Sequence, residues 1–135
     1  MMAADKRATS SGHPITTTKI FRIGDKLVGL AGSGDVCRAM LAWAMDGFKQ
    51  EDFPVVAKDS DVDMLVASRH GVVCYGQGPF PLVIEDRFAA IGCGRDYALA
   101  AMHMGRNAEY AVELACELDV HCGNGIDTLT LGPLQ

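Results

Sequence analysis

The sequence predicts an α+β fold built from antiparallel sheets. Stretches with strand character and stretches with helical spacing come in blocks instead of alternating, which is typical of α+β folds. The helical stretches occupy two separate places in the chain, so we expect helices on both outer sides of the sheets, as in a four-layer α-β-β-α sandwich. A length of 135 residues suits a single domain over residues 1–135.

Strands are predicted where short apolar or β-branched runs are bounded by Gly, Pro or polar residues. The predicted strands are residues 2–9, 16–23, 26–31, 64–67, 72–75, 88–92 and 126–131. Gly24-Asp25 and Arg69-His70-Gly71 are turn signals that would join the neighbouring strands into two hairpins. The polar residues 10–14 and 58–63 are expected to be loops, although a helix end is an alternative for 58–63. The run 88–92 carries no charge, and we expect that strand to be buried.

Helices are predicted where apolar residues recur every three or four positions. The predicted helices are residues 35–50, 95–105 and 108–118. Asp35 is expected to cap the first of them. These helices are rich in methionine, which is interpreted mainly as core filler, with a subunit contact surface as the alternative. The methionines concerned are Met40, Met45, Met102 and Met104.

Composition argues against several classes of protein. The net charge is −5 and the basic residues are scattered, so nucleic acid is not expected as a partner. No apolar run reaches the ~20 residues that span a bilayer, so no membrane partner is expected. The charged residues near the N-terminus are unlike a signal peptide, and a cytoplasmic location is expected.

The cysteines indicate reduced thiols. There are five of them and no C-x-x-C pair, which argues against a disulfide framework and a zinc site, and we expect neither a metal nor another cofactor. His121 and Cys122 are sequence neighbours whose side chains would point apart, so a nucleophile and base pair is not favoured.

A glycine-rich segment, Gly29-x-x-Gly32-x-Gly34, lies between a predicted strand and a predicted helix. A dinucleotide-binding loop read from Gly32 would need glycine where Cys37 stands, and a crossover to a parallel strand is missing. A turn with unusual dihedral angles fits better. Such a turn is compatible with backbone amides that form an oxyanion hole.

Asp5 and Lys19 lie on neighbouring predicted strands, and by themselves they predict no more than a solvated ion pair. Five short segments in a fixed order add to that reading. They are Ala3-Ala4-Asp5-Lys6-Arg7-Ala8-Thr9, Thr18-Lys19-Ile20, Gly29-Leu30-Ala31-Gly32, Ala90-Ile91-Gly92-Cys93-Gly94 and Asp119-Val120-His121-Cys122-Gly123. In this order they resemble the proteasome β-type and HslV-like N-terminal-nucleophile hydrolases over nearly the whole chain.

The resemblance implies a threonine-type peptidase and a set of catalytic residues. By this resemblance Asp5 and Lys19 flank an N-terminal threonine, and the Gly32 N–H contributes to an oxyanion hole. An ammonium near a hydroxyl favours its deprotonated form, while the carboxylate keeps the lysine charged and oriented. Cys93 and Cys122 stand where the family commonly has serine, the second of them after Asp119, and thiols are the weaker donors.

The resemblance also implies how a peptide or protein substrate binds. Arg7, Ala8 and Thr9 resemble the strand that pairs with an extended peptide, and Leu30 and Ala31 would border the specificity pocket. A homo-oligomeric ring is expected on the same grounds. The sequence does not identify an ATP-dependent partner.

The largest departure from the family pattern is the nucleophile. In the family, a strand with an exposed N-terminal threonine or serine precedes the A-A-D segment, and this chain begins two residues before Ala3. Our leading interpretation is a reading frame whose start is assigned too late. An inactive relative kept for assembly and a real fragment are the alternatives. Processing before Thr16, Thr17 or Thr18 is disfavoured because it would remove Asp5.

Overall fold

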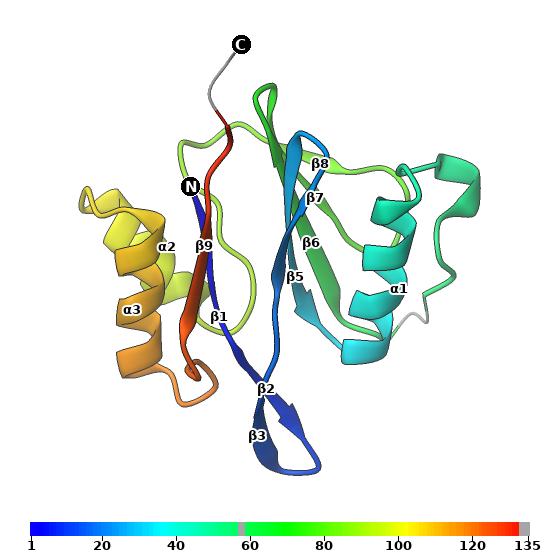
Figure 1. Ribbon diagram of the computed structural model, residues 1–135. Coiled ribbons are helices and arrows are strands. Elements are labelled where there is room, and N and C mark those ends of the chain that lie inside the picture. The colour runs from blue at the N-terminus through cyan, green and yellow to red at the C-terminus, as the bar shows by residue number, and fades with distance from the viewer. Residues whose placement is uncertain (57–58, 133–135) are drawn as a thin grey trace.

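The computed structural model describes residues 1–56 and 59–132. The strands are β1 (Met2–Asp5), β2 (Arg7–Ser10), β3 (His13–Thr16), β4 (Ile20–Ile23), β5 (Lys26–Gly32), β6 (Val62–Ser68), β7 (Gly71–Tyr75), β8 (Leu82–Ile84) and β9 (Ile126–Leu129). The helices are α1 (Gly34–Met45), α2 (Arg95–His103), α3 (Ala108–Leu118) and the short 3-10 turn η1 (Gln50–Asp52). This is a mixed fold of helices and antiparallel sheets (Figure 1).

The largest sheet has five strands in the order β4-β5-β6-β7-β8. All neighbouring strands of this sheet pair antiparallel, which confirms the two hairpins predicted at Gly24-Asp25 and at Arg69-His70-Gly71. Two smaller antiparallel pairs accompany it: β1 pairs with β9, and β2 pairs with β3 in a hairpin that projects beyond the sheets (Figure 1). A dinucleotide-binding fold needs a crossover between parallel strands. Every strand pair in the described part of the chain is antiparallel, so the glycine-rich segment does not lie in such a fold.

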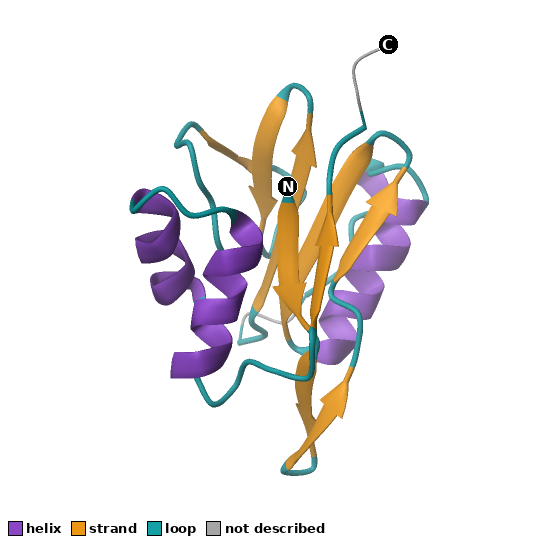
Figure 2. Cartoon of the chain, turned by 60° about the vertical axis from the view of Figure 1, so that its left-hand side comes forward, coloured by secondary structure: helices purple, strands orange, loops and turns teal. Residues whose placement is uncertain are grey.

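Helix α1 covers one face of the five-stranded sheet (Figures 1 and 2). Alternate residues of β5 point to this face, so Val28 and Leu30 pack with Met40 and Trp43 of α1. Trp43 donates its indole N–H to the Lys49 carbonyl at 2.7 Å. The aromatic rings of Phe48, Phe53 and Tyr75 lie edge-on to Trp43 at centroid distances of 4.8 to 5.3 Å.

The opposite face of the five-stranded sheet lies against β1 and β9. The approach is close, because a Cβ at Gly29 would be 3.3 Å from the Met2 sulfur. Helices α2 and α3 lie beyond β1 and β9 (Figure 2). The two helices pack together through the small or flexible residues Ala98, Ala101, Met102 and Ala111.

The predicted methionine roles divide in two. Met40 and Met102 are buried, as core filler should be. Met45 and Met104 are 69% and 84% exposed, so they do not fill the core. No helix in the described residues is long and apolar enough to cross a membrane.

Several predicted strand boundaries were wrong. Residues 2–9 form two strands, because Lys6 leaves the ladder and its carbonyl accepts from the Thr17 N–H at 2.8 Å. Residues 17–19 form no strand, since they link β3 to β4. Residues 88–92 also form no strand, and Phe88 and Ala90 are apolar because they pack on α2 and α3. Two strands, β3 and β8, were not predicted.

Helix ends and loops also differ from the expectation. Helix α1 ends at Met45 instead of residue 50, because Gly47 and Phe48 take positive φ angles of 109° and 57°. Ser33, and not Asp35, is at the N-cap position. Helix α3 has the predicted bounds. Of the predicted loop 58–63, residue 58 lies outside the described residues, and the last two residues already belong to β6.

Candidate active site

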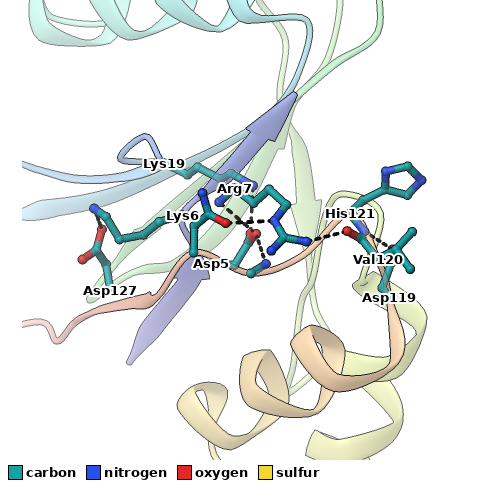
Figure 3. Close-up of polar contacts among 10 residues, drawn as sticks. Asp5, Lys6, Arg7, Lys19, Asp119, Val120, His121 and Asp127 are labelled. Carbon is teal, nitrogen blue, oxygen red and sulfur yellow. Dashed lines mark hydrogen bonds and ion pairs between the residues drawn. The ribbon is translucent and has the colours of Figure 1, made fainter. Parts of the chain in front are cut away.

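Asp5 is the centre of a polar cluster at the end of β1 (Figure 3). It is only 8% exposed and is the one buried polar or charged residue among those described. One carboxylate oxygen, Oδ1, accepts from Lys19 Nζ at 2.8 Å. The other, Oδ2, accepts from the backbone N–H groups of Arg7 at 3.1 Å and Gly123 at 2.9 Å. A buried carboxylate requires such partners, and these three donors come from separate parts of the chain.

Lys19 directly precedes β4, and its backbone fixes it beside β5. The Lys19 carbonyl accepts from the Leu30 N–H at 3.0 Å. Its side chain crosses to Asp5 and remains 26% exposed. The structure therefore brings the predicted carboxylate and ammonium into direct contact. An ammonium has three N–H donors, so a second acceptor can share Lys19 with Asp5.

Gly32 ends β5, two residues beyond Leu30, which is roughly 7 Å along a strand. Its φ angle is +122°, a region that favours glycine. A Cβ at this position would lie 2.1 Å from the Asp61 carbonyl oxygen, so a side chain cannot fit. The glycine-rich segment is thus the turn with unusual dihedral angles that its pattern predicts. The oxyanion role of Gly32 stays a prediction.

The loop of residues 92–94 lies between two predicted parts of the site. A Cβ at Gly92 would be 3.4 Å from Ala31 Cβ, so the loop borders the end of β5. A Cβ at Gly94 would be 3.0 Å from the Cys122 sulfur. Cys93, between these glycines, is exposed. The loop therefore links Ala31 to Cys122, while Leu30 points the other way into the core under α1.

Asp119 and Cys122 lie in the turn after α3. The Asp119 carboxylate accepts from the His121 N–H at 2.8 Å, and its carbonyl accepts from the Cys122 N–H at 3.1 Å. Burial first, and then the nearby carboxylates of Asp5 and Asp119, raise the pKa of the Cys122 thiol to about 11. A protonated thiol is a poor nucleophile. This agrees with the sequence argument against a dyad of Cys122 and the exposed His121.

Arg7 binds the same turn. Its guanidinium donates to the Val120 carbonyl at 2.7 Å and to Asn124 Oδ1 at 2.9 Å. A Cβ at Gly123 would be 2.5 Å from Arg7 Nη2, so a side chain at this position would displace the Arg7 guanidinium. The Arg7 side chain thus holds the turn that carries the Gly123 N–H to Asp5 (Figure 3).

The predicted substrate strand is β2. Ala8 and Thr9 pair with Ile15 and Pro14 of β3, so one edge of β2 is occupied within the chain. Substrate binding by Arg7, Ala8 and Thr9 would use the other edge, and it stays a prediction.

Three residues of the cluster were missed as site residues: Lys6, Asn124 and Asp127. Lys6 Nζ pairs with Asp127 at 2.7 Å, across 121 sequence positions. No local pattern signals a contact at that separation.

Two cavities of the structure lie away from the polar cluster around Asp5. One cavity of about 320 Å³ is lined by residues that include Phe88 and Met102. The other, of about 620 Å³, is lined by residues that include Phe48 and Tyr75. Neither Asp5 nor Lys19 lines these two cavities. Within residues 1–56 and 59–132, no group of three or more His, Cys, Asp or Glu side chains is placed to hold a metal ion.

The chain matches no protein-family model and no curated protein. Solved structures do resemble it. BPH from Thiobacillus denitrificans in complex with epoxomicin gives a TM-score of 0.69 at 20% identity, over 97% of this chain and 92% of that chain. HslV from Trypanosoma brucei gives 0.72 at 20% identity, over 93% and 88%. BPH alone gives 0.68 at 21% identity, over 97% and 92%. The chain therefore shares the fold of HslV and BPH.

Proposed function

We propose that this chain is a subunit of a threonine-type peptide hydrolase of the proteasome and HslV kind. The observation that carries the proposal is the buried Asp5 carboxylate with the Lys19 ammonium 2.8 Å away, on a fold shared with HslV. An exposed ion pair on a random surface would not need a carboxylate held by two backbone N–H groups as well.

In this proposal Lys19 is the group that activates a hydroxyl. The hydroxyl oxygen attacks the carbonyl carbon of the scissile amide, and its proton passes to the nucleophile's own α-amino group and then to the leaving amine. The Lys19 ammonium stabilises the developing oxygen charge, and Asp5 orients it. The Gly32 N–H donates to the tetrahedral oxyanion. Water then hydrolyses the ester that remains.

The proposed substrate is an extended peptide. Its backbone would pair with residues 7–9 on the open edge of β2, and its side chain would sit beside Ala31 and the loop of residues 92–94. The close approach of Gly92 to Ala31 supports a pocket wall at this point. Main-chain pairing provides affinity and the pocket provides selectivity.

We propose further that the nucleophile lies on a strand encoded upstream of Met1. In the described residues β1 pairs only with β9, and a two-stranded sheet is marginally stable by itself. A further strand along β1 would enlarge this sheet and complete a four-layer α-β-β-α sandwich. In this proposal the nucleophile lies on a strand next to β1, which carries Asp5.

A second candidate function is a catalytically silent structural or assembly subunit. The cysteines favour it, because Cys93 and Cys122 replace expected serines and the Cys122 thiol stays protonated with a pKa of about 11. For both candidate functions we propose a cytoplasmic location and assembly into a homo-oligomeric ring. An ATP-dependent partner is not assigned to either. The exposed Met45 and Met104 are available for subunit contacts.

The coding sequence and an assay separate the two candidates. An in-frame segment upstream of Met1 that encodes Thr-Thr and alternating hydrophobic residues is expected for the enzyme. The product with that segment should hydrolyse fluorogenic peptides and gain the mass of epoxomicin, the compound bound in the Thiobacillus denitrificans structure. An in-frame stop directly before Met1, or an extended product that does neither, would contradict the enzyme and favour the silent subunit.

A further inference from the structure

Lys6 joins four segments of the chain around the candidate site. Its backbone N–H donates to the Gly123 carbonyl at 2.9 Å, and its carbonyl accepts from the Thr17 N–H at 2.8 Å. Its ammonium contacts Asp127 Oδ2 at 2.7 Å and donates to Thr18 Oγ1 at 3.1 Å. Lys6 thus connects the end of β1, the turn after α3, β9 and the link between β3 and β4. Figure 3 shows its contact with Asp127.

The ion pair of Lys6 and Asp127 is shorter and less exposed to solvent than the surface pair of Lys26 and Asp25. Its side chains are 23% and 35% exposed, and the two atoms are 2.7 Å apart. The pair of Lys26 and Asp25 is 42% and 69% exposed, at 3.4 Å. Solvent weakens ion pairs as exposure rises, so the Lys6 pair should hold its geometry more firmly.

The segment that depends on Lys6 is the one that carries Lys19. Residues 17–19 belong to no strand, and two of their bonds go to Lys6: the Thr17 N–H and the Thr18 hydroxyl. The next residue is Lys19, whose reach to Asp5 depends on where this segment lies. The Thr17 bond goes to the Lys6 backbone carbonyl, whereas the Lys6 ammonium holds the segment through the Thr18 hydroxyl, one residue before Lys19.

We infer that Lys6, anchored by Asp127, is a positioning residue that sets where the Lys19 ammonium lies against Asp5. The catalytic consequence rests on the proposed function, whereas the geometric claim does not. In this inference Lys6 acts through the Thr17–Lys19 link, because its ammonium donates to Thr18 in that link and is anchored by Asp127.

The geometric claim can be tested on the chain as it stands by trace acetylation with acetic anhydride. Mass spectrometry would give the labelling of Lys19 relative to Lys49 in the same molecule, at one fixed alkaline pH. Lys6→Met keeps the aliphatic stem and the backbone bond to Thr17 but removes the ammonium, so the ratio should rise roughly twofold to fivefold. Lys6→Arg, which can still pair with Asp127, should restore the wild-type ratio.

Two further variants keep the test decisive. Asp127→Asn weakens the anchor while leaving Lys6 in place, and it should raise the ratio even if Lys6→Met fails to fold. Lys26→Met removes a lysine from an exposed ion pair and should leave the ratio unchanged. An unchanged ratio in folded Lys6→Met or Asp127→Asn would overturn the inference, as would an equal rise in Lys26→Met.

The catalytic consequence has its own readout in the hydrolytically active product. Lys6→Met should lower kcat and leave KM nearly unchanged, because it displaces a catalytic ammonium and not a substrate contact. The two failures are distinguishable. If Lys19→Ala retains full hydrolysis, the proposed function fails while the labelling result stands. If Lys19→Ala is inactive and Lys6→Met leaves the labelling ratio unchanged, only the positioning inference fails.

Discussion

Asp5 depends on partners that come from distant parts of the chain. The Gly123 N–H lies 118 positions away and Lys19 lies 14 positions away, yet both donate to one carboxylate. Sequence reasoning found Asp5 and Lys19 through the order of short motifs. It could not find Lys6 with Asp127, or Arg7 with Asn124, because contacts across more than 100 positions leave no periodic signal.

Asp5→Asn should destabilise the fold by about 1–3 kcal/mol, because an amide cannot accept from Lys19 and both backbone donors as the carboxylate does. Urea unfolding monitored by Trp43 fluorescence measures the change. Asp25→Asn, in the exposed pair with Lys26, is the matched control and should leave stability unchanged. Equal effects of the two variants would mean that Asp5 is an ordinary surface acid.

Cys122 should make the fold lose stability at alkaline pH. Its pKa is about 11 in the folded protein against an ordinary value of 9.0, so the unfolded chain releases this proton first as pH rises. The protonated Cys122 thiol makes its full contribution to the free energy of unfolding below pH 9, and this contribution is lost progressively toward pH 11. The free energy of unfolding should therefore fall more steeply over this window in the wild type than in Cys122→Ser. Parallel profiles for the two proteins would contradict the assigned cause.

At the scale of elements, local patterns predicted what is locally determined. Helix α3 was predicted with its observed bounds because its apolar positions recur regularly, and the Asn107 side chain caps it by accepting from Tyr110 N–H. The hairpin turn at Gly24-Asp25 was found for a similar reason. The run 88–92 was misread, since apolar character alone does not distinguish a buried strand from a loop that packs on two helices.

Substitution of two methionines in helix α1 tests which face of this helix contributes to the free energy of unfolding. Met40 is completely buried between α1 and the five-stranded sheet, so Met40→Ala should cost about 2–5 kcal/mol of unfolding free energy. Met45→Ala, at an exposed position of the same helix, should change it by less than about 0.5 kcal/mol. Chemical denaturation gives both values. A large loss in Met45→Ala would show that this residue is covered by another subunit.

At the scale of the whole molecule, the antiparallel mixed fold was predicted and the likeness to HslV and BPH supports it. The packing order explains the site: β1 lies between the five-stranded sheet on one side and α2 with α3 on the other. Its end is therefore where the link before β4 and the turn after α3 meet, through Lys19 and Gly123. Sequence order alone predicted this convergence only through the family resemblance.

The most direct test of the account is peptide hydrolysis by the product that carries its upstream residues, with Lys19→Ala compared against Lys26→Ala. Lys19 contacts the buried Asp5, whereas Lys26 pairs with an exposed aspartate. We expect Lys19→Ala to lower kcat by at least about 100-fold while the protein still folds, and Lys26→Ala to behave as wild type. Full hydrolysis by folded Lys19→Ala would contradict it.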